Sequence, residues 1–432
     1  MAVVDFYRYK RLVQYFWDPE PVNHNANEHS IWCLGREYMN RINNQPPIVI
    51  SSKLSSKTSA ADNKLPSWTN ILSQSDPYNV NSGKTIQECE RNNGGWPLDF
   101  LDDFESRISL TYRSGFKPIA KLQDSQHSSL SIPSALRLKF GDESGFTSDT
   151  GWGCMIRSGQ SLLANAFIIQ KLGRDWRRGM LPHEEHKIIS LFADDPEAPY
   201  SIHKFVEHGA VFCGKNPGQW FGPSATGRCI QALTNNCQNT DLQIYLTGDG
   251  MDVYEDTFMS IAKPDGITFR PTLILIGTRL GLDQITPVYW DALKASLKIP
   301  QSLGIAGGQP SSSHYFIAVQ GSDFFYLDPH QTQPALSFPQ DINEYTHEEI
   351  DSCHTRRLRK IHVKEIDPSM LISFLIRDKE DWDSWRRAIQ NIPHKAFINV
   401  IGTDPLLQNI SNERQSAIEE VETFDDFDDH SL

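Results

Sequence analysis

Several features that would place this chain in a large class of proteins are missing from its sequence. No stretch approaches the roughly 18 consecutive apolar residues of a membrane-spanning helix. Segment 1–21 has no uninterrupted apolar core and no small-residue cleavage site, so we expect no signal peptide. The formal net charge is −13, without the basic excess that attracts phosphate groups, and this argues against nucleic-acid binding.

Motifs for metal and nucleotide chemistry are also missing. The seven cysteines form no Cys-x-x-Cys pair, and an odd number without a signal peptide is typical of reduced thiols in the cytosol. The run HEEH at 183–186 does not match a zinc-protease helix, because position 187 is Lys187 instead of histidine. GTRLGL at 277–282 has the wrong glycine spacing for a nucleotide-binding loop. We therefore expect a cytoplasmic protein with no metal and no organic cofactor.

The chain has the composition of a globular protein, with 39% hydrophobic and 22% charged residues. Its 432 residues suffice for one large domain or two of ordinary size. We assign 1–404 to one folded domain, in which 40–95, rich in Ser, Asn, Lys and Pro, is a disordered or loop insertion. A second polar loop is expected at 123–145. Residues 405–432 are predicted to be an acidic disordered tail.

Hydrophobic periodicity predicts both helices and strands. Helices are expected at 5–17, 158–173 with Gly173 as its cap, 225–237, 290–304 with a glycine cap, and within 370–390. Strands are expected at 272–277, 314–320 and 324–328. The last two strands are separated by Gly-Ser-Asp, which is typical of a hairpin turn. Helices combined with an antiparallel sheet indicate an α+β fold.

Cys154 is the first candidate for chemistry. It follows Gly151 and Gly153, which allow a tight turn, and it precedes an apolar helix. A thiol at a helix N-terminus lies at the positive end of the dipole, which favours the nucleophilic thiolate. The alternative is a small buried apolar residue, as most cysteines are. The other cysteines lack this context: Cys33, Cys89, Cys213, Cys229, Cys237 and Cys353.

Asp328 and His330 form the second candidate, at the end of a predicted strand. A cysteine nucleophile needs a base to accept its proton, and the base needs a third group to orient it. His330 could be that base, and Asp328, two residues earlier on an extended segment, projects its side chain to the same side. The alternative is an ordinary turn after a strand, because Asp and Pro commonly end strands.

Five blocks of sequence together resemble the autophagins, the autophagy-related cysteine endopeptidases of fungi and animals. They are TYRSGF (111–116), SDTGWGCMIRSGQ (148–160), GQWFGPS (218–224), LGIAGGQPSSSHYFIA (303–318) and YLDPHQTQPA (326–335). The N-terminal YKRLVQYFWDP and IWCLGREY are similar to fungal members. The similarity extends to about residue 400, with interruptions at 40–95 and 123–145. The DTGWGC and LDPH blocks in this order are highly specific.

The resemblance implies a papain-like cysteine peptidase fold with a small additional subdomain, so that 1–404 would be the catalytic domain. Cys154 would then be the nucleophile, His330 the general base and acid, and Asp328 the group that holds the imidazole. Tyr112 would donate to the oxyanion beside the backbone N–H of Cys154. Without the resemblance, a strand tyrosine is more simply a core residue.

Two further residues, Trp220 and Pro310, match a gate that covers the catalytic cysteine in the family until substrate arrives. Gly307 and Gly308 would let the loop lift, while an apolar lid keeps water off the thiolate. A narrow tunnel below such a lid admits only residues without side chains, which accounts for glycine at the scissile position. Both gate residues would otherwise be ordinary loop residues.

The tail departs from the family pattern. Family members often end in an acidic segment with an aromatic, two variable residues and an aliphatic, which adds a β-strand to the modifier. Here the segment runs from Phe424 to Phe427, so the second pocket would have to accept an aromatic ring. A tail that only keeps the protein in solution is the equal alternative.

The function implied by the resemblance has two parts. The enzyme would trim a ubiquitin-like autophagy modifier after its C-terminal glycine, and it would release the modifier from phosphatidylethanolamine. It would be recruited to autophagic membranes transiently, through the lipidated substrate. A nuclear pool of the enzyme is the additional expectation. The alternatives are a non-catalytic scaffold that binds a ubiquitin-like protein, and a deconjugase that acts on ubiquitin itself.

Overall fold

The structure, a computed structural model, describes residues 20–25, 28–39, 93–121, 145–238, 240–248, 250–392 and 397–405. The predicted helix at 5–17, most of both polar insertions, and the tail with Phe424 and Phe427 lie outside these residues. The proposed domain boundaries therefore stay predictions. Within the described part, no helix has the length and apolar character needed to cross a bilayer.

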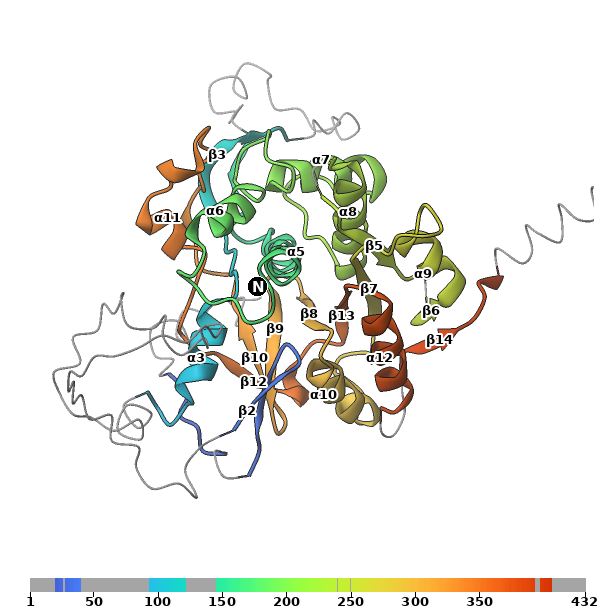
Figure 1. Ribbon diagram of the computed structural model, residues 1–432. Helices are drawn as coiled ribbons and strands as arrows, with labels where there is room; N and C mark the ends of the chain where they lie inside the picture. The colour runs from blue at the N-terminus through green and yellow to red at the C-terminus, as the bar shows by residue number, and fades with distance from the viewer. Residues whose placement is uncertain are drawn as a thin grey trace, which may run out of the picture.

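A sheet of nine strands forms the centre of the described part (Figure 1). Its strands are β1 Ile31–Cys33, β2 Arg36–Tyr38, β5 Gln243–Leu246, β7 Thr272–Arg279, β8 Ser302–Gln309, β9 Ser312–Gln320, β10 Asp323–Leu327, β12 Lys360–His362 and β13 Ser369–Ile376. The main path runs β12-β10-β9-β8-β13-β7-β5, and the β1–β2 hairpin joins it at the end of β9. Only the β5–β7 pair is parallel in this sheet.

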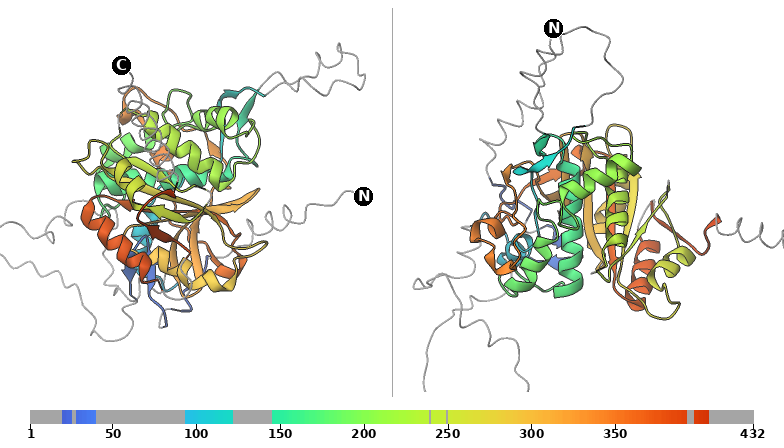
Figure 2. Two further views of the ribbon diagram at one scale, coloured as in Figure 1. Left: turned by 90° about the vertical axis from the view of Figure 1, so that its right-hand side faces the viewer. Right: turned by 90° about the horizontal axis from the view of Figure 1, so that it is seen from above.

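Helices cover both faces of this sheet (Figure 2). On one face lie α3 Leu98–Glu105, α5 Cys154–Leu172, α6 Pro182–Ser190, α7 Ile202–Phe212, α8 Pro223–Asn236 and the short α11 His347–Asp351. On the other lie α9 Glu255–Ala262, α10 Trp290–Lys298 and α12 Lys379–Gln390. Alternate residues of β7 enter the two cores, Leu273 and Leu275 on the first face, Ile274 and Ile276 on the second. The sheet thus separates two hydrophobic cores.

A small sheet brings three distant segments together. It has the order β11-β3-β4, formed by β3 Arg113–Ile119, β4 Phe146–Ser148 and β11 Gln333–Pro334. β4 ends shortly before Cys154, and β11 begins shortly after His330. Pairing both strands with β3 therefore fixes the approach of these two residues. A separate parallel pair joins β6 Asp252–Tyr254 to β14 Asn399–Ile401.

Most of the predicted elements are confirmed. The strands expected at 272–277, 314–320 and 324–328 are β7, β9 and β10, and the predicted hairpin closes with Gln320 opposite Asp323. The helix expected at 158–173 is α5, which ends before Gly173 as predicted but begins earlier, at Cys154. The helix expected at 225–237 is α8. Helices together with a mostly antiparallel sheet confirm the α+β class.

Two predicted helices are wrong in part. The segment 290–304 is helical only to Lys298, and Gly304 lies inside β8 instead of capping a helix. In 370–390, the run MLISFLI is not helical but forms β13, which pairs with β7 on one side and β8 on the other. A short, wholly apolar run does not distinguish a buried strand from a buried helix. The pairing of β13 with a strand on each side makes this segment a central strand of the sheet.

Candidate active site

Cys154 occupies the first position of α5, after a turn built from the DTGWGC segment. The backbone N–H groups of Trp152 and Gly153 both donate to the carbonyl of Asp149, at 3.1 and 2.9 Å. Gly151 has φ 93°, a conformation that favours glycine. A Cβ on Gly153 would lie 2.3 Å from a carboxylate oxygen of Asp149, so only glycine fits there. The two glycines are thus required for this turn.

Buried charges hold the same turn from beneath. Asp149 accepts from the backbone N–H of Arg113 at 2.7 Å and from the Arg157 guanidinium at 2.7 Å. Arg157 also pairs with Asp194 at 2.8 Å, and all three charged side chains are almost fully buried. The guanidinium lies between two carboxylates, and this pairing offsets part of the cost of burying the charges. The turn before Cys154 is therefore anchored to the body of the protein.

The Cys154 thiol is fully buried and has two polar neighbours that act on its ionisation. One is the His330 imidazole, and the other is Ser313, through both its backbone and its hydroxyl. Burial by itself raises the pKa of the thiol, but the hydrogen bonds and the charge of His330, together with Ser313, lower the pKa to about 7. The site can therefore hold a substantial fraction of thiolate near neutral pH.

His330 is oriented by Asp328, as the spacing predicts. Its Nδ1 lies 2.5 Å from Oδ1 of Asp328, and its backbone N–H donates to the same oxygen at 3.1 Å. The guanidinium of Arg359 lies 3.5 Å from the other carboxylate oxygen. Burial would raise the pKa of Asp328, but His330, His314 and Arg359 outweigh it and hold that pKa well below its usual range. The Asp328 carboxylate therefore stays ionised and binds Nδ1 of His330. The other ring nitrogen, Nε2, remains for Cys154.

Tyr112 lies beside this pair. Its backbone N–H donates to the carbonyl of Pro329 at 2.8 Å, and its own carbonyl accepts from Gln333 at 2.8 Å. Its ring meets the His330 ring edge to face, with centroids 5.4 Å apart. The residue is buried, as a core tyrosine would be, but it is buried against His330. The structure thus brings Tyr112 to the site together with Cys154, Asp328 and His330.

Trp220 and Pro310 reach the site by different routes. Trp220, just before α8, donates its indole N–H to the hydroxyl of Ser313 at 3.3 Å. Pro310 is exposed in the two-residue turn between β8 and β9, where Ser311 has φ 63°. The hydroxyl of Ser311 contacts the carbonyl of Gly151 at 3.4 Å. The Pro310 turn therefore lies against the Cys154 turn, and Trp220 lies against a hydrogen-bond partner of the sulfur.

Sequence reasoning missed Ser313 and His314, which are the second and third residues of β9. His314 lies edge to face with His330 at 5.3 Å between ring centroids, and it also packs on Tyr326 at 4.3 Å. Ligand atoms of His314, Asp328 and His330 lie within 4.8 Å of one another, so these residues have the types that could hold a metal. For His314, the sequence signal was a titratable side chain at the start of the apolar run HYFIAV. Ser313 offered none among three serines.

The arrangement has the parts needed for acyl transfer. A thiol with a lowered pKa can act as a nucleophile, a neighbouring imidazole can accept a proton, and the carboxylate that hydrogen bonds to this imidazole can hold its orientation. The N–H groups in the first turn of a helix have no partner within the helix and can face developing negative charge. Cys154 lies at such a position.

Comparisons with known proteins agree with this geometry. A family model described as the peptidase C54 catalytic domain matches residues 97–388. A probable cysteine protease atg4 from Sclerotinia sclerotiorum is 60% identical over 442 residues, covering 100% of this chain and 99% of the relative. A probable cysteine protease atg4 from Botryotinia fuckeliana is 59% identical, with coverage of 100% and 99%. The cysteine protease ATG4 of Pyricularia oryzae is 47% identical, with coverage of 99% and 97%. The chain therefore belongs to the peptidase C54 family, the autophagins of fungal type, and is a papain-like cysteine endopeptidase of autophagy.

Proposed function

We propose that this enzyme cleaves a ubiquitin-like autophagy modifier after its C-terminal glycine and also hydrolyses the amide that joins this glycine to phosphatidylethanolamine. Both reactions are acyl transfers that share one covalent intermediate. The Cys154 thiolate attacks the glycine carbonyl, the C–N bond breaks, and His330 donates a proton to the departing amine. Water, deprotonated by His330, then cleaves the thioester. The products are the glycine carboxylate and the free thiol.

The observation that carries this proposal is the convergence of three groups: Asp328 hydrogen bonds to Nδ1 of His330, and the His330 imidazole acts on the Cys154 thiol. Asp328 would hold the imidazole in one orientation and stabilise its charged form after it has taken a proton. The lowered thiol pKa supports Cys154 as the nucleophile, because attack requires the thiolate. A scaffold that only binds a ubiquitin-like protein would have no need of all three groups, and this argues against the non-catalytic alternative.

We assign Tyr112 and the backbone N–H of Cys154 to the oxyanion that forms during attack. The burial of Tyr112 against the His330 ring supports this role, because it places a phenol beside the proposed base. Donors of this kind are effective when they are already in position as charge develops on oxygen. Loss of one such donor costs about 10²–10³ in rate in a comparable enzyme.

We assign Trp220 and Pro310 to a gate over Cys154. The contact of Trp220 with Ser313 and the contact of the Pro310 turn with Gly151 support it. Ser311 has φ 63°, in the left-handed region that a residue with a Cβ adopts at some cost, and this supports a turn that can rearrange. The gate would account for the choice of glycine at the cleaved bond.

The enzyme would act on two forms of the modifier, a soluble precursor and a lipid conjugate. The enzyme would therefore act in the cytoplasm and reach autophagic membranes only while it is bound to lipidated substrate. A deconjugase of ubiquitin remains the rival within the same chemistry. No metal or organic cofactor is needed for either reaction.

One gel assay tests the proposal. Precursor modifier and a ubiquitin fusion of equal tail length are incubated separately with the full-length protein, with Cys154→Ala as the inactive control. We expect cleavage of the modifier precursor alone, and a precursor with alanine in place of the scissile glycine should remain intact. Cleavage of the ubiquitin fusion at a comparable rate would favour the rival, and cleavage of neither would overturn the proposal.

A further inference from the structure

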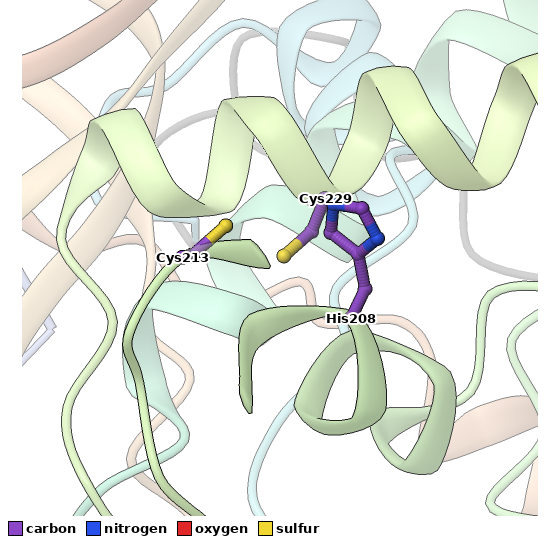
Figure 3. Close-up of side chains that lie close together, drawn as sticks. All are labelled: His208, Cys213 and Cys229. Carbon is purple, nitrogen blue, oxygen red and sulfur yellow. The ribbon is translucent and has the colours of Figure 1, made fainter. Parts of the chain in front are cut away.

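A second group of chemically capable side chains lies outside the active site, between α7 and α8 (Figure 3). His208 is on α7, Cys213 is the residue that ends this helix, and Cys229 is on α8. The ligand atoms of the three side chains all lie within 4.8 Å of one another. Figure 3 shows both sulfur atoms and the imidazole ring turned into the same space between the helices.

Local packing holds the three residues in this arrangement. α7 packs directly on α8. Gly209 of α7 lets the ring of Phe221, in the segment just before α8, lie against this helix, because a Cβ there would lie 2.2 Å from the ring. Cys229 is fully buried, whereas His208 and Cys213 are half-buried. One side of the group is therefore closed by the core, and the other side is open to solvent.

Each thiol makes a long contact with a backbone carbonyl, and the two thiols also interact with each other. The Cys213 sulfur lies 4.0 Å from the carbonyl oxygen of Ala225, and the Cys229 sulfur lies 3.7 Å from that of Phe205. Such contacts are weak, because a thiol is a poor donor. The sulfur atoms are thus free to exchange these contacts for stronger bonds without disturbing a helix.

We propose that His208, Cys213 and Cys229 bind one zinc ion, with water as the fourth ligand on the open side. Zinc bonds to thiolate at about 2.3 Å and to imidazole at about 2.0 Å, so tetrahedral ligands lie about 3.5–3.8 Å apart. The observed separations need only a small inward movement to reach these values. Two sulfurs and one imidazole are a ligand set that zinc prefers over calcium or magnesium.

Charge at the site is consistent with a divalent cation. Two thiolates and one Zn²⁺ sum to zero, so the neighbouring guanidinium of Arg228 meets no net positive charge. Cys213 also lies at the C-terminus of α7, where the helix dipole favours a cation. A metal here would fasten the two ends of the 214–222 loop, which carries Trp220. This inference does not depend on the proposed function.

A disulfide between Cys213 and Cys229 is the competing chemistry. Both cysteines are free thiols in the structure, and a disulfide between them would leave the neighbouring His208 imidazole without a role. A bound cation, by contrast, stabilises both thiolates at once and displaces their protons. The lack of a Cys-x-x-Cys pair speaks only against ligands that are close in sequence, whereas these three residues come from two packed helices.

Cobalt titration of the full-length Cys154→Ala protein tests the proposal, because that variant has no active-site thiol. The protein is reduced, stripped with a chelator and titrated with Co²⁺, whose tetrahedral thiolate complexes give charge-transfer and visible bands. We expect bands that saturate at one Co²⁺ per chain and disappear when Zn²⁺ is added. Cys213→Ser and Cys229→Ser should each weaken Co²⁺ binding at least about 100-fold, more than outer-shell substitutions do.

Cys237→Ser is the matched control, since Cys237 ends the same helix α8 but is not among the three ligands. It should keep the cobalt bands.

Zn²⁺ at about 100 times its Kd should raise Tm by roughly 3–8 °C in the Cys237→Ser control but not in Cys213→Ser. Cys213→Ser keeps this test informative if the buried Cys229→Ser variant fails to fold. No thiolate bands in reduced protein, bands unchanged in both ligand variants, or a Cys213–Cys229 disulfide in place of metal binding would each overturn the proposal.

Discussion

The indole N–H of Trp220 donates to the hydroxyl of Ser313 at 3.3 Å, and Ser313 in turn hydrogen bonds to the sulfur of Cys154. A proposed gate residue and the proposed nucleophile therefore share one partner. The Ser313 oxygen can accept from Trp220 while its O–H donates to the sulfur, so lifting Trp220 away would remove a contact that polarises this hydroxyl. The arrangement couples opening of the gate to the ionisation of the thiol, and it makes Ser313 the most informative residue for pH measurements.

Ser313→Ala should raise the pKa of Cys154 above its value of about 7, because the hydroxyl hydrogen bond favours the thiolate. A hydrogen bond to a charged group contributes about 1.5 kcal/mol, which corresponds to roughly one pKa unit. The pH at which alkylation by iodoacetamide is half-maximal should therefore move upward by up to about one unit. Ser312→Ala, whose side chain points to the other face of β9, should leave the alkylation profile unchanged. An unshifted profile in Ser313→Ala would remove Ser313 from the account of thiol activation.

Cys154→Ala and Cys154→Ser should abolish cleavage while the protein remains folded and still binds the modifier. Loss of a covalent nucleophile costs roughly 10⁴ or more in rate. Gel cleavage assays, with circular dichroism for folding and a pull-down for binding, provide the measurement. Processing by either variant at near the native rate would show that another residue is the nucleophile.

Asp328→Asn should lower kcat by roughly 10³–10⁴, because the amide cannot hold His330 in the same orientation or stabilise its charged form. Asp323→Asn is a matched control on the same strand β10, where Asp323 pairs with Lys360 at 2.7 Å, away from His330. Its kcat should remain close to that of the wild type. Equal losses in the two variants would point to a general weakening of β10 instead of a role for Asp328 in catalysis.

Arg157→Met should destabilise the protein by about 3–5 kcal/mol, because it leaves Asp149 and Asp194 buried without their shared cation. Activity should fall further than stability alone explains, since Asp149 shapes the turn before Cys154. Urea unfolding measures the first effect. Lys204→Met, which breaks an exposed pair with Glu207, should barely change the midpoint. A small change in Arg157→Met would mean that the buried charges are not needed for stability.

Truncation after residue 418 should weaken processing at low substrate concentration and matter little at saturation. An acidic segment with aromatic residues can add to a sheet edge of the modifier and raise the effective concentration of the active site. The loss should be greater on membranes, where lipidated modifier is held at a surface. Phe424→Ala should cause most of the loss and Phe427→Ala less. Steady-state kinetics of the full-length, truncated and point-mutant enzymes provide the measurement. An unchanged apparent affinity for both soluble and membrane-bound modifier would show that the tail does not bind the substrate.

Features that depend on neighbouring residues follow from the amino-acid sequence without knowledge of the fold. The glycines around Cys154, the helix that follows it and the pairing of Asp328 with His330 each involve residues a few positions apart. Backbone rules for glycine, helix ends and extended strands apply at that range without knowledge of the fold. The specific motifs then identified the family, which the comparisons confirm.

Contacts between segments that are distant in sequence become visible only in the folded protein. Ser313 reaches the Cys154 sulfur because β9 lies next to β8 under α5, and no local pattern in a run of serines indicates this contact. The apolar run of β13 became a strand because β7 and β8 pair with it on both sides. His208, Cys213 and Cys229 meet because two helices pack closely. Each of these outcomes depends on long-range pairing and burial, whose partners a local sequence pattern does not specify.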